Sequence, residues 1–259
     1  MKKDTKIKVV SALAAGSILL TLAGCSEELA PDVSDLDVLN TNYEDDASTN
    51  TLNEGVEQIK EVPDENFKLV INYQSGSKEW KINANKSLYV TIKTKGLPSD
   101  KEVYIDNIHM DTSIVSTKAQ FDGIEQDSMD DRIHNSLMLG FPISDTNSYF
   151  GVNEIEGQNQ TFLQGYSYGY RGYQHGEVET KRYLEKDFLE HGVWANKVDS
   201  VIDLIIVDKT TGEKRVVSVD TKLLIEVNNK ITYLDGNNYV TYQYDRDGEA
   251  KQIKKEQKK

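Results

Sequence analysis

The chain has a single cysteine, Cys25, among its 259 residues, so it cannot form an internal disulfide. Its folded part must therefore be stabilised by a core of packed side chains. Long apolar runs are also missing, since the most apolar stretch, residues 9–22, has 14 residues. A helix needs about 20 residues to cross the hydrocarbon core of a bilayer, so this stretch is too short to be a permanent transmembrane helix.

Motifs that mark common enzymes are missing as well. The sequence contains no Gly-x-Ser-x-Gly, no His-Glu-x-x-His and no phosphate-binding loop. Its histidines do not pair at a spacing typical of metal ligands; they are His109, His134, His175 and His191. A non-enzymatic function is therefore the better interpretation, and a catalytic one stays open as an alternative.

Basic residues are outnumbered, with 30 Lys and Arg against 43 Asp and Glu, for a formal net charge of −13. Thirteen of the acidic residues lie in 26–66, where Lys60 is the one basic residue. Strong acidity without a basic patch argues against binding to nucleic acid. Residues 26–66 also lack a sustained apolar period, so we expect them to form a disordered acidic tether.

The first 24 residues have the pattern of a secretory signal peptide. Basic side chains precede the apolar stretch, and small residues end it. The basic residues are Lys2, Lys3, Lys6 and Lys8. We therefore expect export across a membrane.

The end of this segment, Leu22-Ala23-Gly24-Cys25, resembles the lipobox of bacterial lipoproteins. The resemblance implies cleavage between Gly24 and Cys25 and a covalent diacylglyceryl group on the Cys25 thiol. Two acyl chains contribute about 0.8 kcal/mol per buried CH₂, enough for stable anchoring. The mature protein would then be held on a cell membrane and face outside the cytoplasm.

The remaining chain divides into three parts. Residues 25–66 comprise the lipidated cysteine and the tether, residues 67–250 a globular domain, and residues 251–259 a basic tail. The domain is long enough for one proper core. We expect the tail to be solvated, with contact to anionic lipid or cell-wall polymer as the alternative.

Alternating apolar residues predict that the domain is mostly β. The expected strands are 67–73, 88–92, 103–108, 113–117, 136–142, 201–207, 215–219, 223–227, 231–234 and 239–244, with hairpin turns at 209–213 and 235–238. One amphipathic helix is expected at 180–191, with Gly192 as its C-terminal cap. These elements predict an antiparallel β-sandwich with one inserted helix, and an immunoglobulin-like arrangement is the first hypothesis.

An acidic stretch at 122–134 is the first candidate site. A divalent cation is the conceivable ligand, because carboxylates and histidines are common metal ligands. The candidate ligands are Asp122, Asp127, Asp130, Asp131 and His134. The alternatives are a solvated loop, which is the commoner structure for such a stretch, and a metal-assisted hydrolase built on His134. A fragment at 245–248 resembles part of a calcium loop but is better interpreted as a turn.

A tyrosine-rich stretch at 165–176 is the second candidate. In an extended strand Tyr166, Tyr168 and Tyr170 share one face, and Tyr173 follows. Exposed, these rings predict a surface that binds a protein or a cell-envelope polymer. Buried, they would belong to the core.

Three functions follow from these observations. The leading hypothesis is a membrane-anchored lipoprotein whose β-rich domain binds a protein or cell-envelope partner. The first alternative is the hydrolase of 122–134. The second is that the signal peptide supplies a secreted signalling peptide, because residues 17–24 resemble the peptide pheromones of some Gram-positive bacteria.

Overall fold

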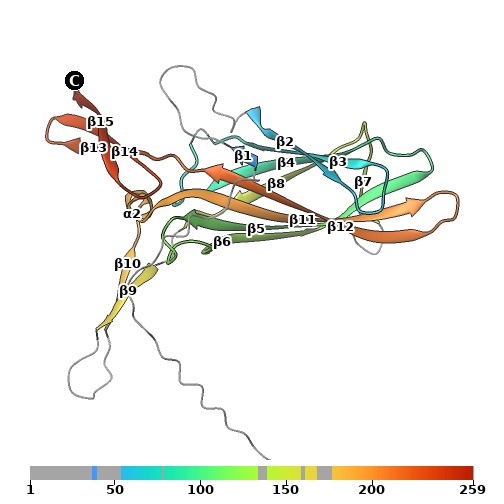
Figure 1. The fold of residues 1–259 in the computed structure, drawn as a ribbon, viewed down its shortest axis with the longest axis horizontal. Helices are drawn as coiled ribbons and strands as arrows, with labels where there is room; N and C mark the ends of the chain where they lie inside the picture. The colour runs from blue at the N-terminus through green and yellow to red at the C-terminus, as the bar shows by residue number, and fades with distance from the viewer. Residues whose placement is uncertain are drawn as a thin grey trace, which may run out of the picture.

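The computed structural model describes residues 37–39, 54–77, 79–133, 139–158, 161–167 and 177–258, with the backbone alone at 37–39, 161–167 and 177–182. Almost every described element is a strand, and two sheets pack face to face (Figure 1). The predicted antiparallel β-sandwich with an inserted helix is confirmed.

The larger sheet, called here the long sheet, has the order β1-β12-β11-β5-β6, with β7 also paired to β5. Its two longest strands have 16 residues each and pair antiparallel over nearly their whole length. The strands are β1 (Asp37–Leu39), β5 (Lys101–Ser116), β6 (Glu125–Arg132), β7 (Phe141–Ile143), β11 (Val193–Asp208) and β12 (Lys214–Glu226).

The second sheet, called the short sheet, has the order β2-β3-β4-β8, and all its pairs are antiparallel. Its strands are β2 (Val56–Glu61), β3 (Lys68–Ser75), β4 (Lys86–Lys95) and β8 (Tyr149–Ile155). Alternate residues of β4 point into the sandwich, because successive side chains of a strand face opposite sides. Leu88, Val90 and Ile92 are accordingly buried.

The strand order is that of an immunoglobulin-like sandwich. In the short sheet, β3, β4 and β8 take the places of strands A, B and E. In the long sheet, β6, β5, β11 and β12 take the places of C′, C, F and G. Four features differ from that scheme: β2 extends the short sheet, β1 adds a parallel edge strand to β12, β7 also pairs with β5, and strand D has no counterpart in the described ranges.

The insertion between β8 and β11 contains a two-stranded ribbon and the helix. The ribbon consists of β9 (Thr161–Ser167) and β10 (Glu177–Arg182), and it extends away from the sandwich (Figure 1). Helix α2 spans Glu185–Glu190, so the predicted helix at 180–191 is too long at its start. Residues 180–182 pair with β9 instead, and the expected aromatic residues Tyr183 and Phe188 are buried near the helix.

Gly192 ends the helix as predicted. Its φ is +70°, a left-handed conformation that glycine adopts without the steric cost of a Cβ. A Cβ at this position would lie 2.2 Å from the Thr117 hydroxyl oxygen, so any larger residue would clash.

A three-stranded antiparallel sheet, called here the C-terminal sheet, lies beside α2 at one end of the molecule (Figure 1). It consists of β13 (Lys230–Asp235), β14 (Asn238–Tyr244) and β15 (Ala250–Gln257). Backbone bonds join it to the sandwich, since the Asn228 N–H donates to the Trp80 carbonyl and the Val227 N–H to the Trp194 carbonyl.

Three polar segments differ from expectation. Residues 251–257 are exposed, as expected of a solvated tail, but they are not a free end, because they form β15 on β14. The tether does not reach residue 66, because β2 pairs along β3 and Val62 is buried. Residues 125–132 are not a loop but strand β6, paired with β5. In each case the backbone hydrogen bonds of the strand form although the sequence has no alternation of apolar and polar residues that predicts a strand.

Candidate binding site

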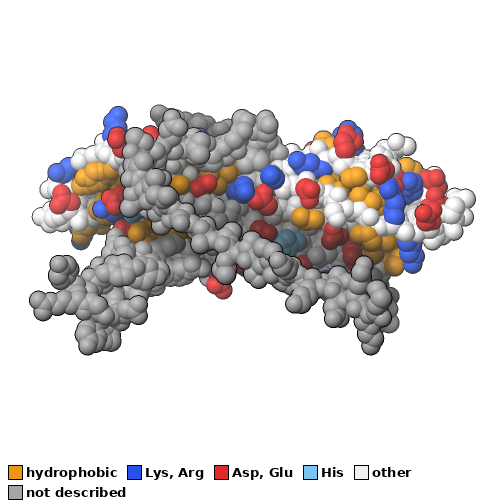
Figure 2. Space-filling model, turned by 60° about the horizontal axis from the view of Figure 1, so that its bottom comes forward, with side chains coloured by type: hydrophobic (Ala, Val, Ile, Leu, Met, Phe, Trp, Pro, Cys, Tyr) orange, Lys and Arg blue, Asp and Glu red, His pale blue; other side chains and the backbone are white. Residues whose placement is uncertain are grey.

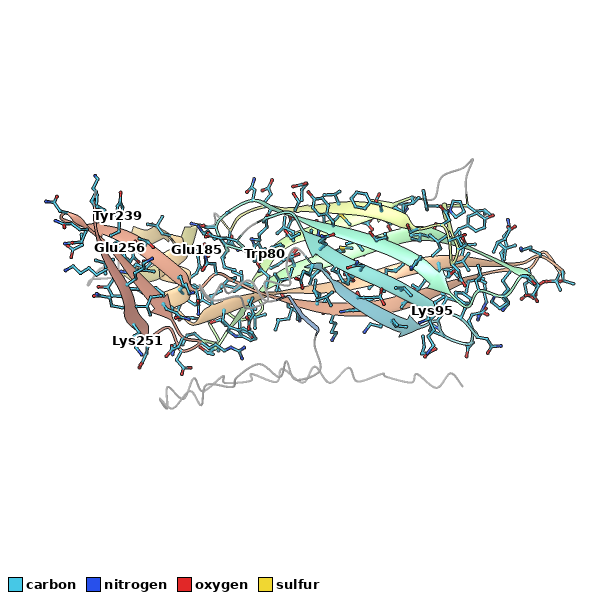
Figure 3. The ribbon with its side chains drawn as sticks, turned by 90° about the horizontal axis from the view of Figure 1, so that it is seen from above. Trp80, Lys95, Glu185, Tyr239, Lys251 and Glu256 are labelled. Carbon is cyan, nitrogen blue, oxygen red and sulfur yellow. The ribbon has the colours of Figure 1, made fainter. Side chains whose placement is uncertain are left out.

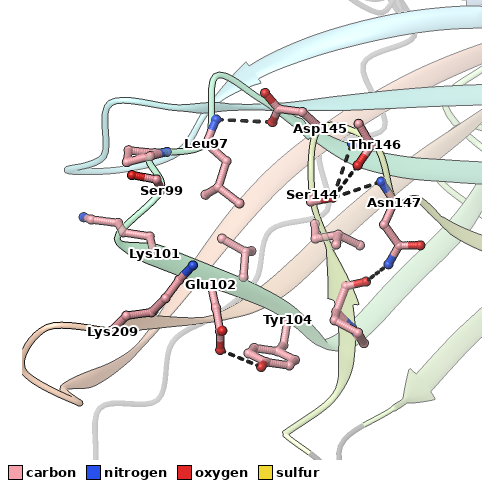
Figure 4. Close-up of a pocket in the computed structure, with 14 residues that line it drawn as sticks. Leu97, Ser99, Lys101, Glu102, Tyr104, Ser144, Asp145, Thr146, Asn147 and Lys209 are labelled. Atoms are coloured by element: carbon pink, nitrogen blue, oxygen red, sulfur yellow. Dashed lines mark hydrogen bonds between the residues drawn. The ribbon is translucent and has the colours of Figure 1, made fainter.

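Three connections meet at the end of the sandwich opposite the C-terminal sheet. They are residues 96–100 between β4 and β5, 144–148 between β7 and β8, and 209–213 between β11 and β12. Together they border an open pocket of about 440 Å³ (Figure 4). Leu97, Val103 and Ile143 give it an apolar floor, and the rim is polar. The polar side chains include Ser99, Lys101, Glu102, Tyr104, Asn147 and Lys209.

Asp145 fixes two of these connections against each other. One of its carboxylate oxygens accepts a 2.6 Å hydrogen bond from the Thr94 hydroxyl. The backbone N–H groups of Gly96 and Leu97 donate to the same carboxylate, at 2.8 and 3.2 Å. The Thr94 bond is the main reason why the pKa of Asp145 is lowered, so this carboxylate is ionised at neutral pH.

A partly buried ion network lies at the same end of the sandwich. The Glu65 carboxylate, on the β2–β3 connection, accepts hydrogen bonds from Lys101 of β5 and Arg215 of β12. Its side chain is only 3% exposed. Burial opposes ionisation of Glu65, but the two cationic partners outweigh it, so the pKa of Glu65 is lowered. The network joins the short sheet to the long sheet below the pocket.

The rim offers hydrogen-bonding groups of several kinds. The Tyr104 hydroxyl donates a 2.8 Å bond to Glu102, and this bond is the main cause of the raised pKa of Tyr104. The Lys209 N–H donates to the Asp100 carbonyl at 2.8 Å, which joins the first and third connections. Amines, carboxylates and an amide around an apolar floor suit the binding of a polar ligand.

Charge on the surface is mixed. Figure 2 shows Lys and Arg side chains next to Asp and Glu over the described part of one face, without a broad area of one sign. The described part of this face therefore has no broad potential of one sign that would steer a charged partner.

The predicted cation site is not assembled in the described part of the chain. Among those residues, no three His, Cys, Asp or Glu side chains lie close enough to hold a metal ion. Asp122 accepts a bond from the Ser116 N–H, and Asp130 accepts one from the Asn107 amide. His134, which is also the base in the hydrolase alternative, lies outside the described residues.

The other two acidic candidates have a structural role. Asp131 of β6 accepts a 2.6 Å hydrogen bond from the Tyr149 hydroxyl of β8, and Asp127 accepts a 3.0 Å bond from the Glu156 N–H. β6 and β8 are edge strands of opposite sheets. These two carboxylates therefore close one side of the sandwich.

The tyrosine surface is described only in part. Tyr166 lies on β9 opposite Val178 of β10. Tyr168, Tyr170 and Tyr173 belong to the connection between β9 and β10, and they lie outside the described residues, as do Gly24 and Cys25. The helices of the described ranges include none that is both long and apolar enough to cross a membrane.

An exposed aromatic pair was missed by the sequence analysis. The rings of Tyr89 and Phe150 stack with their centroids 5.9 Å apart on the outer face of the short sheet, and Phe150 is 62% exposed. Large apolar residues occur in both phases of the alternation in β8, so the pattern alone does not tell which side chains face solvent.

A buried amine was also missed. Lys86, at the start of β4, is 3% exposed, and its Nζ donates to the backbone carbonyls of Lys81 and Ala84 at 2.7 and 3.3 Å. Burial lowers the pKa of Lys86 to about 7, although Glu185 and Asp127 favour its charged form. Burial likewise raises the pKa of Glu185, which accepts bonds from the Ile82 and Asn83 N–H groups.

The amine belongs to a polar network between the sandwich and α2, where Trp80 and Glu185 lie near each other (Figure 3). The Trp80 indole N–H donates a 2.8 Å bond to the Asn196 side chain. The Asn196 amide then donates to Gln126 at 2.9 Å and to the Ser113 carbonyl at 3.0 Å. Hydrogen bonds within the chain account for these groups, so we interpret the network as structural.

No family model matches the chain, and no curated protein matches it. The function must therefore be inferred from the sequence and from the geometry described above.

Proposed function

We propose that this protein is a lipoprotein, anchored by a diacylglyceryl group on Cys25 to the outer face of a cell membrane, and that its sandwich binds a protein or cell-envelope polymer. The observation that carries the binding role is the pocket bordered by three connections and held by Asp145. A preformed site loses little conformational freedom on binding, which favours affinity.

The strand order supports this choice of site. In immunoglobulin variable domains, the loops between strands B and C and between strands F and G bind the ligand. Residues 96–100 and 209–213 hold those places in this chain, because they connect β4 to β5 and β11 to β12. Connections on a rigid scaffold are where binding residues commonly lie.

The position of β1 supports an orientation away from the membrane. Leu39 pairs with Ile225, near the end of β12 that leads to the C-terminal sheet. From Lys214 to Ile225 the strand extends over roughly 36 Å at about 3.3 Å per residue. Between Cys25 and Asp37 the chain reaches at most about 43 Å. A lipid on Cys25 would thus attach the domain by its β1 end, at the other end of β12 from the pocket, while a reach longer than β12 does not by itself fix the orientation.

The β9–β10 ribbon favours the predicted tyrosine surface as a second contact. A ribbon that extends from the sandwich can reach a partner, and Tyr166 lies on its first strand (Figure 1). Tyrosine provides contact area at a low entropic cost, which suits such a surface.

Capture of partners from the envelope of the source organism tests the binding role. The bait is a chain of residues 25–259, and the pocket variant carries Lys209→Ala and Asn147→Ala, both at exposed positions. We expect the pocket variant to lose at least about tenfold in affinity for a captured partner, which is typical of losing central contacts. The matched control is Lys95→Ala, an exposed lysine outside the pocket. Equal capture by all three proteins would rule the pocket out as the binding site.

Mass spectrometry of protein extracted from its own membranes tests the anchor. We expect a mature N-terminus at Cys25 with the added mass of a diacylglyceryl group. An unmodified cysteine, or cleavage elsewhere, would contradict the proposed anchorage and leave the binding role to be judged by the capture experiment.

A further inference from the structure

The outer strand of the C-terminal sheet is basic and exposed. β15 pairs with β14 on one side, and every residue of β15 is exposed. Within 250–258 the charged side chains are four lysines and Glu256. The lysines are Lys251, Lys254, Lys255 and Lys258. This concentration of positive charge is a local exception in a chain with a net charge of −13.

A bulge in β15 brings two of these lysines to one face. Thr241 lies opposite Lys254 and Gln243 opposite Lys251, and the register shifts between these pairs. In a regular strand, residues three apart face opposite sides. The bulge adds one residue, Ile253, to β15 and leaves it without a partner in β14. Lys251 and Lys254 then pair with residues of β14 that are two apart and face the same side. Lys251 and Lys254 therefore share the face of Thr241 and Gln243.

The same face carries exposed apolar side chains. Leu234 of β13 lies opposite Tyr239 of β14, and they are 53% and 41% exposed. Tyr239 in turn lies opposite Glu256 of β15, and Figure 3 shows both at one end of this sheet. On the opposite face the side chains of Val240 and Tyr244 in β14 are buried, at 3% and 2% exposed. Glu256 lies on the same face and forms a 3.2 Å ion pair with Lys254. Lys251 and Lys254 outnumber this carboxylate, so with the aromatic ring and the leucine the face combines positive charge and apolar area, as surfaces that contact membranes do.

The location of this face fits the proposed anchorage. β12, on whose end β1 pairs, continues through 227–229 directly into β13. The chain that leads from Cys25 thus enters the fold next to the C-terminal sheet, and the pocket lies at the opposite end (Figure 1).

We propose that the exposed face of the C-terminal sheet, with Leu234, Tyr239, Lys251 and Lys254, rests on an anionic phospholipid surface. This proposal depends on the anchorage but not on the pocket. Lysines are attracted to the negative surface potential of anionic bilayers, and Tyr239 and Leu234 provide apolar contact at the headgroups. The lipid on Cys25 would hold the domain at the membrane, and this face would set its orientation with the pocket pointing outward.

Vesicle flotation tests the proposal without the covalent lipid. The protein is a chain of residues 25–259 with Cys25→Ser, which contains every described element. The probes are vesicles of phosphatidylcholine alone and vesicles of phosphatidylcholine with phosphatidylglycerol. We expect binding to the anionic vesicles only, and weaker binding as added salt shortens the screening length below about 10 Å.

A pair of charge-matched variants locates the binding face. Lys251→Gln with Lys254→Gln removes two charges from the proposed face, and we expect at least about a tenfold loss of binding to anionic vesicles. Lys93→Gln with Lys95→Gln removes the same charge from exposed positions of β4, and Lys95 lies far from the C-terminal sheet (Figure 3). This control is expected to bind like the parent protein.

Three outcomes would overturn the proposal: no binding to anionic vesicles, an equal loss in both variants, or binding to soluble polyphosphate but not to vesicles. The last would assign the face to an anionic polymer. None of them bears on the mass of Cys25 or on capture through the pocket, so failure here is distinguishable from failure of the proposed function.

Discussion

The Tyr149 hydroxyl donates a 2.6 Å hydrogen bond to the Asp131 carboxylate, and this bond joins an edge strand of the short sheet to an edge strand of the long sheet. Burial is the main cause of the raised pKa of Tyr149, and the bond to Asp131 adds to it, so the phenol keeps its proton. An immunoglobulin-like sandwich has no backbone pairing across this side, and side chains must supply the connection.

Replacing Tyr149 with Phe removes that connection and leaves the ring in place. We expect Tyr149→Phe to lower the free energy of unfolding by about 1–2 kcal/mol, since bonds to a charged partner contribute more than neutral ones. Urea denaturation followed by circular dichroism measures the change. Tyr239→Phe, at an exposed position of β14, is the control and is expected to change stability by less than about 0.5 kcal/mol.

Lys86 predicts a pH dependence with a definite sign. Its pKa is lowered from 10.5 to about 7 in the folded protein, so between these values the unfolded chain binds more protons. Stability then rises with pH from about 7 to about 10.5, by at most about 1.4 kcal/mol per unit. We expect the difference in unfolding free energy between wild type and Lys86→Met to change with this slope.

The control for this titration is Lys81→Met, which removes a partly exposed lysine from the connection that precedes β4. It corrects the comparison for the loss of one positive charge close to Lys86. A constant difference between wild type and Lys86→Met over this range would contradict a lowered pKa of Lys86.

Asn196 connects three groups, so its loss is expected to be costly. Asn196→Ala leaves the Trp80 indole N–H, the Gln126 carbonyl oxygen and the Ser113 carbonyl short of a partner in a buried region. We expect a loss of about 2–4 kcal/mol in thermal or urea denaturation, because each buried unsatisfied group costs about 1–3 kcal/mol. A loss below about 0.5 kcal/mol, similar to that of the exposed Gln257→Ala, would contradict this role.

The tyrosine surface is testable by one triple variant. We expect Tyr166→Ala, Tyr168→Ala and Tyr170→Ala together to abolish partner capture while the far-ultraviolet circular dichroism and the urea midpoint stay unchanged. If the variant unfolds, the rings belong to the core, and the binding surface at these residues is wrong.

Local patterns in the sequence predict much of the fold. Alternation in 67–73 and 88–92 marks β3 and β4, since one face of each strand is buried. The turns at 209–213 and 235–238 contain Gly212 and Gly236, whose φ values are +72° and +58°. A glycine in a polar segment predicts a turn because glycine adopts positive φ without steric cost. The predicted turn at 245–248 also occurs, with the Gly248 N–H donating to the Asp245 carbonyl.

Strand lengths and polar strands follow from tertiary pairing and were predicted poorly. Residues 215–219 and 223–227 were expected as two strands, but Asp220, Thr221 and Lys222 continue the ladder with β11 and merge them into β12. β6 and β15 are rich in charged residues, and they are strands because neighbouring strands supply hydrogen-bond partners. The residue pattern of one strand alone does not show which neighbouring strands will pair with it.

The candidate site could not be found from local sequence, because its three connections lie far apart along the chain. Leu97, Asn147 and Lys209 meet only through the sandwich topology. The acidic residues at 122–131 were predicted to be metal ligands because their side-chain chemistry is visible in the sequence. Their actual partners, such as the Tyr149 hydroxyl, depend on the packing of two sheets.

The bonds that join the C-terminal sheet to the sandwich have a consequence for spectroscopy. The chain has two tryptophans, Trp80 and Trp194, and the backbone carbonyl of each accepts a bond from the segment that leads into β13. Intrinsic tryptophan emission is therefore sensitive to one junction of this protein. Arg246, in the turn between β14 and β15, lies over the Trp194 ring at 3.9 Å from its centroid, so detachment of the C-terminal sheet is expected to shift the emission maximum. The described residues at the pocket end include no indole, so a local rearrangement there is expected to leave the emission unchanged.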